Sequence, residues 1–349
     1  MKRFSILIAV LCLCLTGCGK QTTEATAQIF AMDTVMEVAA YGEHAEQAVK
    51  YTEKRIEELE NRLSRTKADS LVSGLNRDGS IRHLTYDYWN LIARAKEYRD
   101  ATNGAFDITI APVMDAWGFT GDSFRIPEQS ELDELLKHVN SDEIQIQEEP
   151  SYSVTLGEGQ AIDLGGIAKG YTSDLVEQTF RANGIESGKI SLGGNVFVLG
   201  GKPDGSDWRV GIKDPRNESG LAAILSLRDA YAITSGGYER YFEENGKTYH
   251  HIIDPSTGYP ADSGLLSVTV VAADNGPDWA GAGNGAMCDA FSTALFVMGE
   301  EQALDFWRNG GYDFDLVLVT EDGRVVITAG LADRFEEVKD SGYTYETVS

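Results

Sequence analysis

Two oxygen-bearing side chains stand in an apolar segment near the carboxyl-terminal end of the sequence. Residues 286–299 (AMCDAFSTALFVMG) are apolar almost all round, which predicts a buried helix, yet they include Asp289. An ionised carboxylate there is costly unless something compensates it. Thr293 follows one helical turn later, on the same face. Because Mg²⁺ and Ca²⁺ take carboxylate, hydroxyl and carbonyl oxygens, Asp289 and Thr293 form a candidate hard-cation site. An aspartate hydrogen-bonded to a loop or to a helix N-terminus explains the pattern equally well.

A glycine-rich turn is the second candidate. Residues 161–171 (AIDLGGIAKGY) set Asp163 before a Gly-Gly turn that leads into a helix. The segment matches neither GxGxxG nor the Walker pattern, so it does not support an ordinary dinucleotide-binding or P-loop fold. Such a turn can hold phosphate on free N–H groups, with Lys169 adding charge, although a plain strand–helix joint is the commoner explanation. A second glycine pair, Gly193-Gly194, lies between two strand-like runs and fits a hairpin turn.

Adjacent histidines open the segment 250–260 (HHIIDPSTGYP). His251 is a candidate for proton transfer, because histidine titrates nearest to neutral pH. A structural role is the commoner one for a lone histidine. Asp254-Pro255 is explained by turn chemistry. Cys288, inside the apolar helix, is interpreted as a packing residue.

The elements that must position these residues are irregularly interleaved, which predicts a mixed α+β fold. Helices are expected at residues 43–63, 85–102 and 132–139. Strand-like alternation is found at residues 34–41, 151–156, 189–192, 208–212, 222–227, 266–271 and 315–319. No linker interrupts the body, so residues 29–335 are expected to form one unit of two packed subdomains, and residues 336–349 a loosely held polar tail.

The N-terminus resembles an export signal. Residues 1–17 begin with two cations and continue with an apolar run, which is too short for a comfortable membrane span of about 20 residues. Leu15-Thr16-Gly17-Cys18 resembles a bacterial lipobox, which predicts cleavage before Cys18, lipidation of its thiol, and a tether over residues 18–28. Cys12 and Cys14 leave with the signal and Cys18 carries lipid, so Cys288 is the one remaining free thiol and no intramolecular disulfide is expected.

The chain is strongly acidic. Its 349 residues hold 30 Lys and Arg against 55 Asp and Glu, a formal charge of -25. This charge excludes nonspecific binding of nucleic acid, whose affinity rests on Lys and Arg. Cleavage after residue 17 removes Lys2 and Arg3 and no acidic residue, which makes the formal charge still more negative. Acyl chains rather than basic patches are therefore expected to hold the protein on a membrane.

Nine motifs follow one another in a distinctive order along the sequence. They are MDT at 32–34, SLVSGLN ending at Asn76, GAFDITIAPVMDAWGF at 104–119, IDLGGIAKGY at 162–171, SLGGNVFVLGG at 191–201, WRVGIKDPR at 208–216, ITSGGYERYF at 233–242, HIIDPSTGYP at 251–260 and CDAFSTALFVMG at 288–299. In this order they closely resemble the FAD:protein FMN transferase (ApbE) family over about residues 29–330.

The resemblance implies an enzyme with a T-fold-like architecture. Its activity would be Mg²⁺-dependent cleavage of FAD as substrate, with FMN transferred through a phosphoester to a Ser or Thr of an acceptor protein and AMP released. The expected acceptor is an exported electron-transfer protein. The expected location is the outer face of the bacterial cytoplasmic membrane, or the periplasmic side of a membrane, with Cys18 as the lipid anchor. The alternatives are an FAD pyrophosphatase and a flavin-binding lipoprotein without catalysis.

The resemblance also assigns site residues. It places the metal on Asp289, Thr293 and a main-chain oxygen at Ala168, and makes His251 the general base toward the acceptor hydroxyl. It assigns flavin contacts to Met32, Asp107, Thr109, Gly194 and Glu239. Three features depart from the family pattern: Asp33 where MGT is usual, Thr66 where many members carry an aromatic residue, and a Gly-rich stretch at 275–285 that is read as a lid or an insertion.

Overall fold

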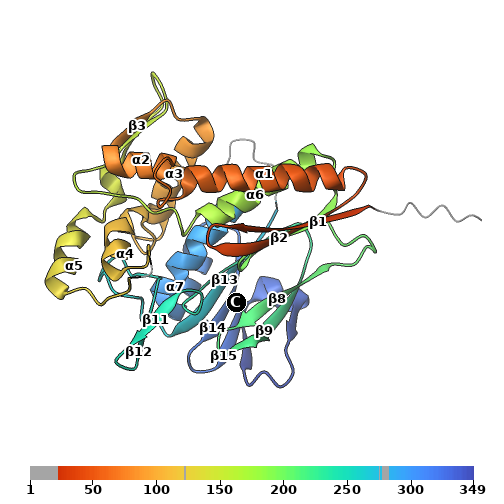
Figure 1. The fold of residues 1–349 in the computed structure, drawn as a ribbon. Coiled ribbons are helices and arrows are strands. Elements are labelled where there is room, and N and C mark those ends of the chain that lie inside the picture. Colours follow the sequence, from red (N-terminus) through yellow and green to blue (C-terminus); the bar gives the residue numbers. More distant parts are fainter. Residues whose placement is uncertain (1–22, 122, 275, 277–282) are drawn as a thin grey trace, which may run out of the picture.

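A nine-stranded sheet forms the centre of the molecule (Figure 1). The computed structural model describes residues 23–121, 123–274, 276 and 283–349. Neighbouring strands of the sheet are antiparallel, except the parallel pair β15–β17. In spatial order the strands are β1 (Glu24–Ala31), β2 (Thr34–Tyr41), β6 (Ser187–Leu192), β7 (Asn195–Leu199), β10 (Ala230–Gly236), β13 (Leu265–Ala273), β14 (Asp315–Thr320), β15 (Arg324–Thr328) and β17 (Thr344–Val348).

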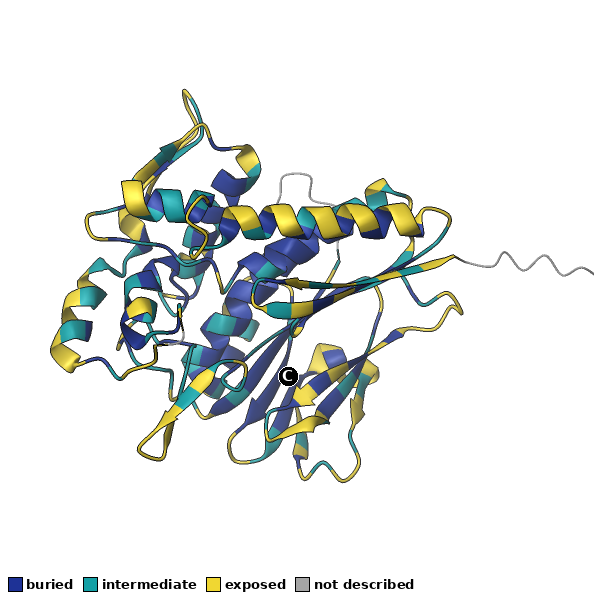
Figure 2. Cartoon of the chain, in the orientation of Figure 1, coloured by how far each residue is buried: buried dark blue, intermediate teal, exposed yellow. Residues whose placement is uncertain are grey.

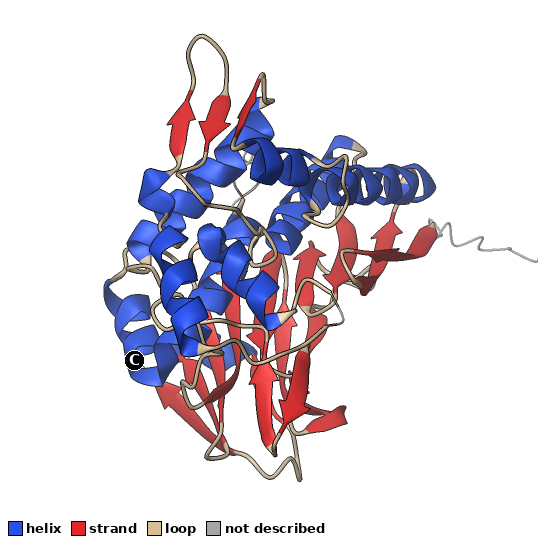
Figure 3. Ribbon diagram, turned by 60° about the vertical axis from the view of Figure 1, so that its left-hand side comes forward, coloured by secondary structure: helices blue, strands red, loops and turns tan. Residues whose placement is uncertain are grey.

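Helices cover one face of this sheet, as Figure 3 shows. The long ones are α1 (Ala45–Leu63), α3 (Tyr86–Ala101), α6 (Ala168–Ala182) and α7 (Asn284–Asn309). Their apolar faces and the facing strand residues form the largest core, which includes Ile56, Tyr171 and Phe291. The dark-blue interior in Figure 2 follows these helices and the sheet beneath them. Gly299, with φ 77°, breaks the helical backbone inside α7 at the last residue of the predicted apolar stretch.

A smaller sheet covers part of the opposite face. It consists of β16 (Phe335–Glu337), β9 (Asn217–Leu227) and β8 (Trp208–Asp214), in that order. Their apolar side chains meet those of the main sheet in a second core that contains Trp208, Leu225 and Val317. The main sheet therefore separates two cores, and the expected α+β class is confirmed.

Shorter elements surround the end of the helical layer. They are α2 (Leu71–Asp78), α4 (Ala111–Trp117), α5 (Gln129–Leu135), the 3₁₀ turns η1 (Ile108–Ile110), η2 (Leu136–His138) and η3 (Ser141–Glu143), the strands β3 (Ser80–Arg82), β4 (Gln145–Gln147) and β5 (Ser153–Thr155), and the hairpin β11 (Tyr241–Glu244) and β12 (Lys247–His250). A further 3₁₀ turn, η4 (Ala329–Arg334), lies instead against β9, β14 and β15, in the second core. A third core around Trp117 joins α4 and α5 to this hairpin. No helix of the described residues is long and apolar enough to cross a bilayer.

Two expectations about the ends of the body are wrong. The tether was expected to run to residue 28, but β1 begins at Glu24 because Ala25, Ala27 and Ile29 face the core while the polar residues between them face out. The loose tail after residue 335 contains β17, whose Val348 packs on the main core. Polar composition conceals an edge strand, since only one of its faces needs apolar side chains. Residues 1–17, Cys18 and most of the stretch 275–285 lie outside the described residues.

Candidate active site

Two tight turns meet at one end of the main sheet. Met32 and Asp33 connect β1 to β2 with φ 50° and 59°, and Gly193 and Gly194 connect β6 to β7 with φ 58° and 101°. Two-residue hairpins with positive φ at both positions match the twist of antiparallel strands. A Cβ on Gly193 would lie 2.1 Å from Thr34 Oγ1, so the turns touch. The turn needs a positive φ at residue 33, which aspartate tolerates, so Asp33 fits the backbone at the position where MGT has glycine. The Asp33 side chain is exposed.

The glycine-rich turn brings the first residues of α6 to the same end of the sheet. Asp163 stabilises this turn, because its Oδ1 accepts a hydrogen bond of 2.7 Å from the Gly165 N–H. Ala168 is the first residue of α6, and its carbonyl oxygen accepts a bond of 2.7 Å from the Thr172 hydroxyl. The same hydroxyl lies 3.8 Å from the sulfur of Met32. The structure therefore brings Met32 and Ala168 into one neighbourhood.

Helix α7 presents Asp289 and Thr293 to this turn. Asp289 is 3% exposed, and its Oδ2 accepts a bond of 2.8 Å from the Gly170 N–H, in the first turn of α6. A Cβ on Gly166 would lie 3.3 Å from Thr293 Oγ1. Thr293 also lies 3.2 Å from the hydroxyl of Ser235 on β10. One oxygen of Asp289 thus has the helix N-terminus as its partner, while no hydrogen bond to Oδ1 is found within the described residues.

The donor set around Asp289 suits a hard cation. The described residues include no group of three or more His, Cys, Asp or Glu side chains placed to hold a metal. A cation here would have to be held by one carboxylate together with hydroxyl and carbonyl oxygens, which are the ligands that Mg²⁺ accepts and Zn²⁺ rarely chooses. Asp289, Thr293 and the Ala168 region supply this chemistry, and their role as metal ligands stays a prediction.

Glu239 approaches the second hairpin turn. A Cβ on Gly194 would lie 2.9 Å from Glu239 Oε1, so the carboxylate stands directly over this glycine. Although Glu239 is exposed, the surrounding protein desolvates its carboxylate enough to raise its pKa. The positive charge of Lys169 opposes this rise, and the negative charge of Asp289 adds to it. Gly194, Glu239 and Asp289 therefore share one electrostatic environment.

His251 follows the hairpin β11–β12, which Trp117 anchors. The Trp117 ring packs against Tyr249 at 5.4 Å between centroids, and its indole N–H donates to Gly258 O at 2.7 Å. His251 Nδ1 lies 3.2 Å from the carbonyl oxygen of Arg240. A carbonyl only accepts, so Nδ1 carries the proton in this bond and Nε2 keeps its lone pair.

The surroundings of His251 keep its ring neutral. Desolvation, followed by the charge of Lys169, lowers the pKa of His251 to about 3. The neighbouring His250 is bonded differently, because its Nε2 lies 3.0 Å from the carbonyl oxygen of Ala261. Its ring also meets Phe296 edge-on. Of the two histidines, His251 has the free ring nitrogen, and the positive charge of Lys169 acts on both His251 and Glu239. His250 is a packed structural residue.

Asp107 and Thr109 lie apart from these contacts. The Asp107 carboxylate is 6% exposed and accepts bonds of 2.9 and 2.6 Å from the backbone N–H and the hydroxyl of Thr109. It also accepts from the N–H and hydroxyl of Ser141. Both oxygens are thus used in capping η1 and tying it to η3. The pair borders the site through Ile108, whose carbonyl accepts from the Asp163 N–H at 2.7 Å. Its contact with flavin stays a prediction.

Sequence reasoning missed one basic residue at the border of the site. Arg65 is paired with Asp163 at 3.2 Å and with Asp115 at 2.6 Å, and it donates to the Thr120 hydroxyl at 2.7 Å. It thereby ties the turn before α6 to the segment after α4. Its neighbour Thr66 is exposed, so no ring stands at that position. A lone arginine between serine and threonine gives no periodic signal, and only the fold brings its partners together.

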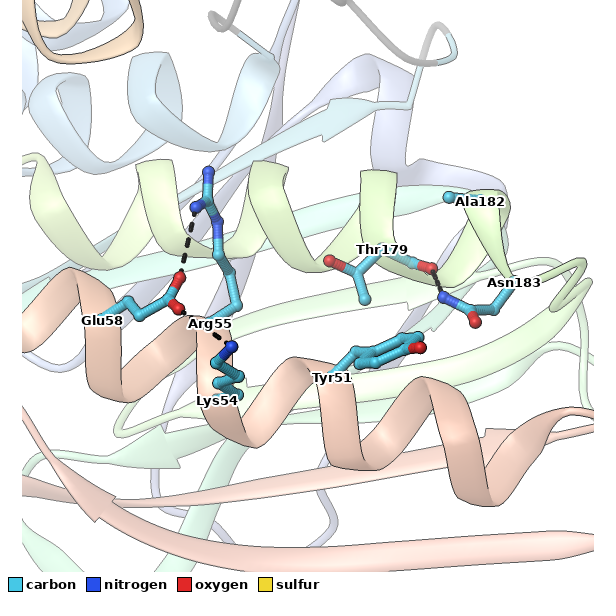
Figure 4. Close-up of a pocket in the computed structure, with 7 residues that line it drawn as sticks. All are labelled: Tyr51, Lys54, Arg55, Glu58, Thr179, Ala182 and Asn183. Carbon is cyan, nitrogen blue, oxygen red and sulfur yellow. Dashed lines mark hydrogen bonds and ion pairs between the residues drawn. The ribbon is translucent and has the colours of Figure 1, made fainter. Parts of the chain in front are cut away.

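A groove elsewhere on the surface does not belong to this site. Figure 4 shows it between α1 and α6, with Tyr51 and Lys54 on one wall. Its α6 residues are Thr179, Ala182 and Asn183, at the opposite end of that helix from Ala168. The groove is open and shallow, and the chemistry described above lies outside it.

Comparison with known proteins fits this arrangement. A family model described as the ApbE family matches residues 32–316. The chain belongs to the ApbE family. The FAD:protein FMN transferase of Treponema pallidum is 30% identical over 368 aligned residues, which cover 99% of this chain and 98% of the relative. That of Klebsiella pneumoniae is 34% identical over 294 residues, covering 82% and 86%.

Solved ApbE structures share the fold. The ApbE protein of Thermotoga maritima is 30% identical with a TM-score of 0.78, over 91% of this chain and 97% of that one. The apo form of the Pseudomonas stutzeri flavinyl transferase ApbE is 26% identical with a TM-score of 0.74, over 91% and 95%. The expected ApbE family and its mixed α/β architecture are therefore confirmed.

Proposed function

We propose that this ApbE protein is an FAD:protein FMN transferase that cleaves FAD with Mg²⁺ and attaches FMN to a Ser or Thr of an acceptor protein. The observation that carries the proposal is the meeting of Asp289, Thr293 and the start of α6, beside the two hairpin turns and the free nitrogen of His251. The relatives named FAD:protein FMN transferase support the substrate and the reaction class.

The chemistry is a single displacement at phosphorus. The acceptor hydroxyl oxygen forms a bond to the phosphorus of the FMN half, and the bond from that phosphorus to the bridging oxygen breaks. AMP leaves with the electron pair of the broken bond. The hydroxyl proton passes to His251 Nε2, which holds a free lone pair because Nδ1 donates to Arg240. A general base contributes about 10²-fold or more when its pKa lies near the working pH, so the pKa of His251, about 3 without substrate, would have to rise when the negatively charged phosphates bind.

The chain's own residues position the reactants. Phosphoryl transfer needs in-line alignment and neutralisation of charge on the phosphate oxygens more than covalent help. A bound Mg²⁺ would supply that neutralisation, held by Asp289, Thr293 and the main chain at Ala168. Lys169 adds a positive charge that acts on both Glu239 and His251. The two hairpin turns, at Met32 and Gly194, would line the flavin half of the substrate.

The proposal extends to location and partner. The N-terminal pattern ending at Cys18 supports an exported protein held by lipid on the outer face of the cytoplasmic membrane, or the periplasmic side of a membrane. Only residues 18–23 separate the proposed anchor from β1, so the first residue of β1 can lie no more than about 20 Å from Cys18. An acceptor at the same surface, such as an exported electron-transfer protein with a Ser or Thr flavinylation motif, fits this reach.

Incubation with FAD, Mg²⁺ and an acceptor protein tests the function. Flavin fluorescence that stays on the acceptor after denaturing electrophoresis, with AMP released in equal amount, is the expected result. Free FMN and AMP without labelled acceptor would indicate a pyrophosphatase in place of a transferase. Intact FAD after long incubation would indicate a binding protein. A sample with EDTA measures the dependence on Mg²⁺.

A further inference from the structure

Helices α6 and α7 carry the same short pattern and use it reciprocally. In α6 Gly170 is followed four residues later by Asp174, and in α7 Gly285 is followed four residues later by Asp289. The Gly170 N–H donates to Asp289 at 2.8 Å, and the Gly285 N–H donates to Asp174 at 2.8 Å. Each aspartate therefore accepts from the first turn of the other helix, where backbone N–H groups lack partners of their own.

The two glycines form the point where the helices cross. A Cβ on Gly170 would lie 2.1 Å from the carbonyl oxygen of Gly285, and a Cβ on Gly285 would lie 2.4 Å from the carbonyl oxygen of Gly170. Any larger residue would separate the helices and lengthen both reciprocal bonds. The crossing thus fixes the spacing between the start of α6, with Ala168, and the face of α7 that carries Asp289.

The two aspartates differ in the oxygens that they keep free. Asp174 is 2% exposed, and its second oxygen accepts from the Ala286 N–H at 3.0 Å. The Tyr231 hydroxyl of β10 lies near this carboxylate and favours its ionised form. Asp289, by contrast, binds its partner helix through Oδ2 alone. Both oxygens of Asp174 therefore bind the first turn of α7, whereas Asp289 has an oxygen left for a ligand.

We propose that Asp174 is a positioning residue, which holds the first turn of α7 on α6 and on β10 so that Asp289, one turn further along, is fixed for the cation. The inference rests on the proposed Mg²⁺ site. In this role Asp174 itself touches neither substrate nor metal. Its carboxylate complements the positive end of the α7 dipole and satisfies two N–H groups. Without it the first turn of α7 loosens, and the carboxylate of Asp289 loses its fixed place beside Gly170.

The matched test compares two buried acids of the same helix. Asp174→Asn removes the charge and turns an N–H donor toward the α7 backbone, while Glu177→Gln makes the same change at a residue that is also 2% exposed but pairs with Arg181. Calorimetric titration with MgCl₂ alone gives the dissociation constant. The Mg²⁺ concentration for half-maximal FMN transfer gives a second reading. Asp174→Asn is expected to raise both by about tenfold, the lower end for residues that orient metal ligands. Glu177→Gln is expected to leave both unchanged.

A milder substitution tests the inference if the Asp174→Asn protein does not fold. Tyr231→Phe removes the hydroxyl that favours the ionised form of Asp174 and keeps the ring that packs on Phe197 at 4.6 Å. Its expected effect is a smaller rise, of about threefold, with transfer restored by excess Mg²⁺. If the folded variants of Asp174 and Tyr231 keep the parent's Mg²⁺ constants, or if Glu177→Gln shifts them equally, the inference is overturned and the proposed function stands. If the parent itself needs no Mg²⁺, both fail together.

Discussion

Asp289 shows how one side chain can satisfy two interpretations at once. It is bonded to a helix N-terminus through one oxygen, which is a structural role, and no hydrogen bond to its other oxygen is found within the described residues, which leaves that oxygen for the proposed metal. Asp289→Asn should therefore reduce Mg²⁺-dependent FMN transfer to background, because an amide is a poor ligand for Mg²⁺. Asp305→Asn, on the exposed side of the same helix, is the control and should transfer at the parent rate. Equal rates for both variants in an acceptor-labelling assay would contradict the metal assignment.

His251 should affect the transfer step more than substrate binding. His251→Ala removes the nitrogen proposed to accept the hydroxyl proton, so the turnover number is expected to fall about 10²-fold or more. The dissociation constant for FAD, measured by flavin fluorescence with the acceptor omitted, should change by less than about threefold, since no pyrophosphate contact is lost. A variant that loses FAD affinity and turnover to the same extent would make His251 a binding residue.

The same histidine should make stability depend on pH. The pKa of His251 is about 3 in the folded protein, against an ordinary value of about 6.5. The unfolded chain therefore binds a proton below about pH 6.5 that the folded protein refuses, and the free energy of unfolding falls as pH drops from about 6.5 toward 3. Between pH 7 and pH 5 the free energy of unfolding of the His251→Gln variant, measured with urea, should decrease less than that of the parent. Parallel slopes for parent and variant would show that the ring is not desolvated.

The candidate residues were predictable to different degrees. Asp289 and Thr293 stand out in the sequence, because an acid in an apolar helix violates the pattern of its surroundings. Asp174 lies in a less apolar helix, and the structure alone shows that Gly285 and Ala286 donate to it. Asp107 illustrates the reverse case. The resemblance assigns it to flavin, while the structure shows its oxygens occupied by Thr109 and Ser141.

The crossing of α6 and α7 is the element contact on which the site depends. Gly170→Ala should lower the free energy of unfolding by about 1–3 kcal/mol, because the new methyl group would meet the backbone of Gly285. Gly74→Ala in α2 is the matched control, since its Cβ would meet only the end of Arg77, at 3.8 Å. It should gain about 0.5–1 kcal/mol from helix propensity. Thermal or urea unfolding measures both, and a stabilised Gly170→Ala protein would contradict the tight crossing.

Elements with a strong period were predicted well, and those without one were not. The helix expected at 43–63 is α1 within two residues, because its apolar residues recur every three or four positions. The strands β6, β8 and β13 also appear where alternation placed them. The helix expected at 132–139 is instead α5 followed by η2, since the 3₁₀ turn tightens its last residues. Edge strands β1 and β17 do not stand out in the sequence, because the inward residues of β1 are mostly alanine and β17 has a single aliphatic residue.

The whole molecule is organised by one sheet with different roles at its two edges. The candidate site belongs to the half formed by β1, β2, β6, β7 and β10. The far edge is closed by β17, which is joined to the smaller sheet by two tyrosines. The Tyr345 hydroxyl donates to Ala222 O at 3.0 Å, and the Tyr343 hydroxyl donates to Asp214 at 2.6 Å. Substitutions at the β17 edge should therefore change stability, and substitutions in the half from β1 to β10 should change catalysis.

Changes at the far edge test that separation. Tyr345→Phe should cost about 1–3 kcal/mol of unfolding free energy, because Ala222 O loses its donor and the Val338 N–H and the Ser341 hydroxyl lose their partner. A chain ending at residue 339 should lose more, since it lacks β17 and leaves β15 as an unpaired edge. Below their unfolding temperatures both proteins should transfer FMN at the parent rate per folded molecule, as β17 contacts none of the candidate site residues. A truncated protein with parental stability would contradict the structural role of β17. A folded one that has lost transfer would show that the two edges are coupled through the sheet.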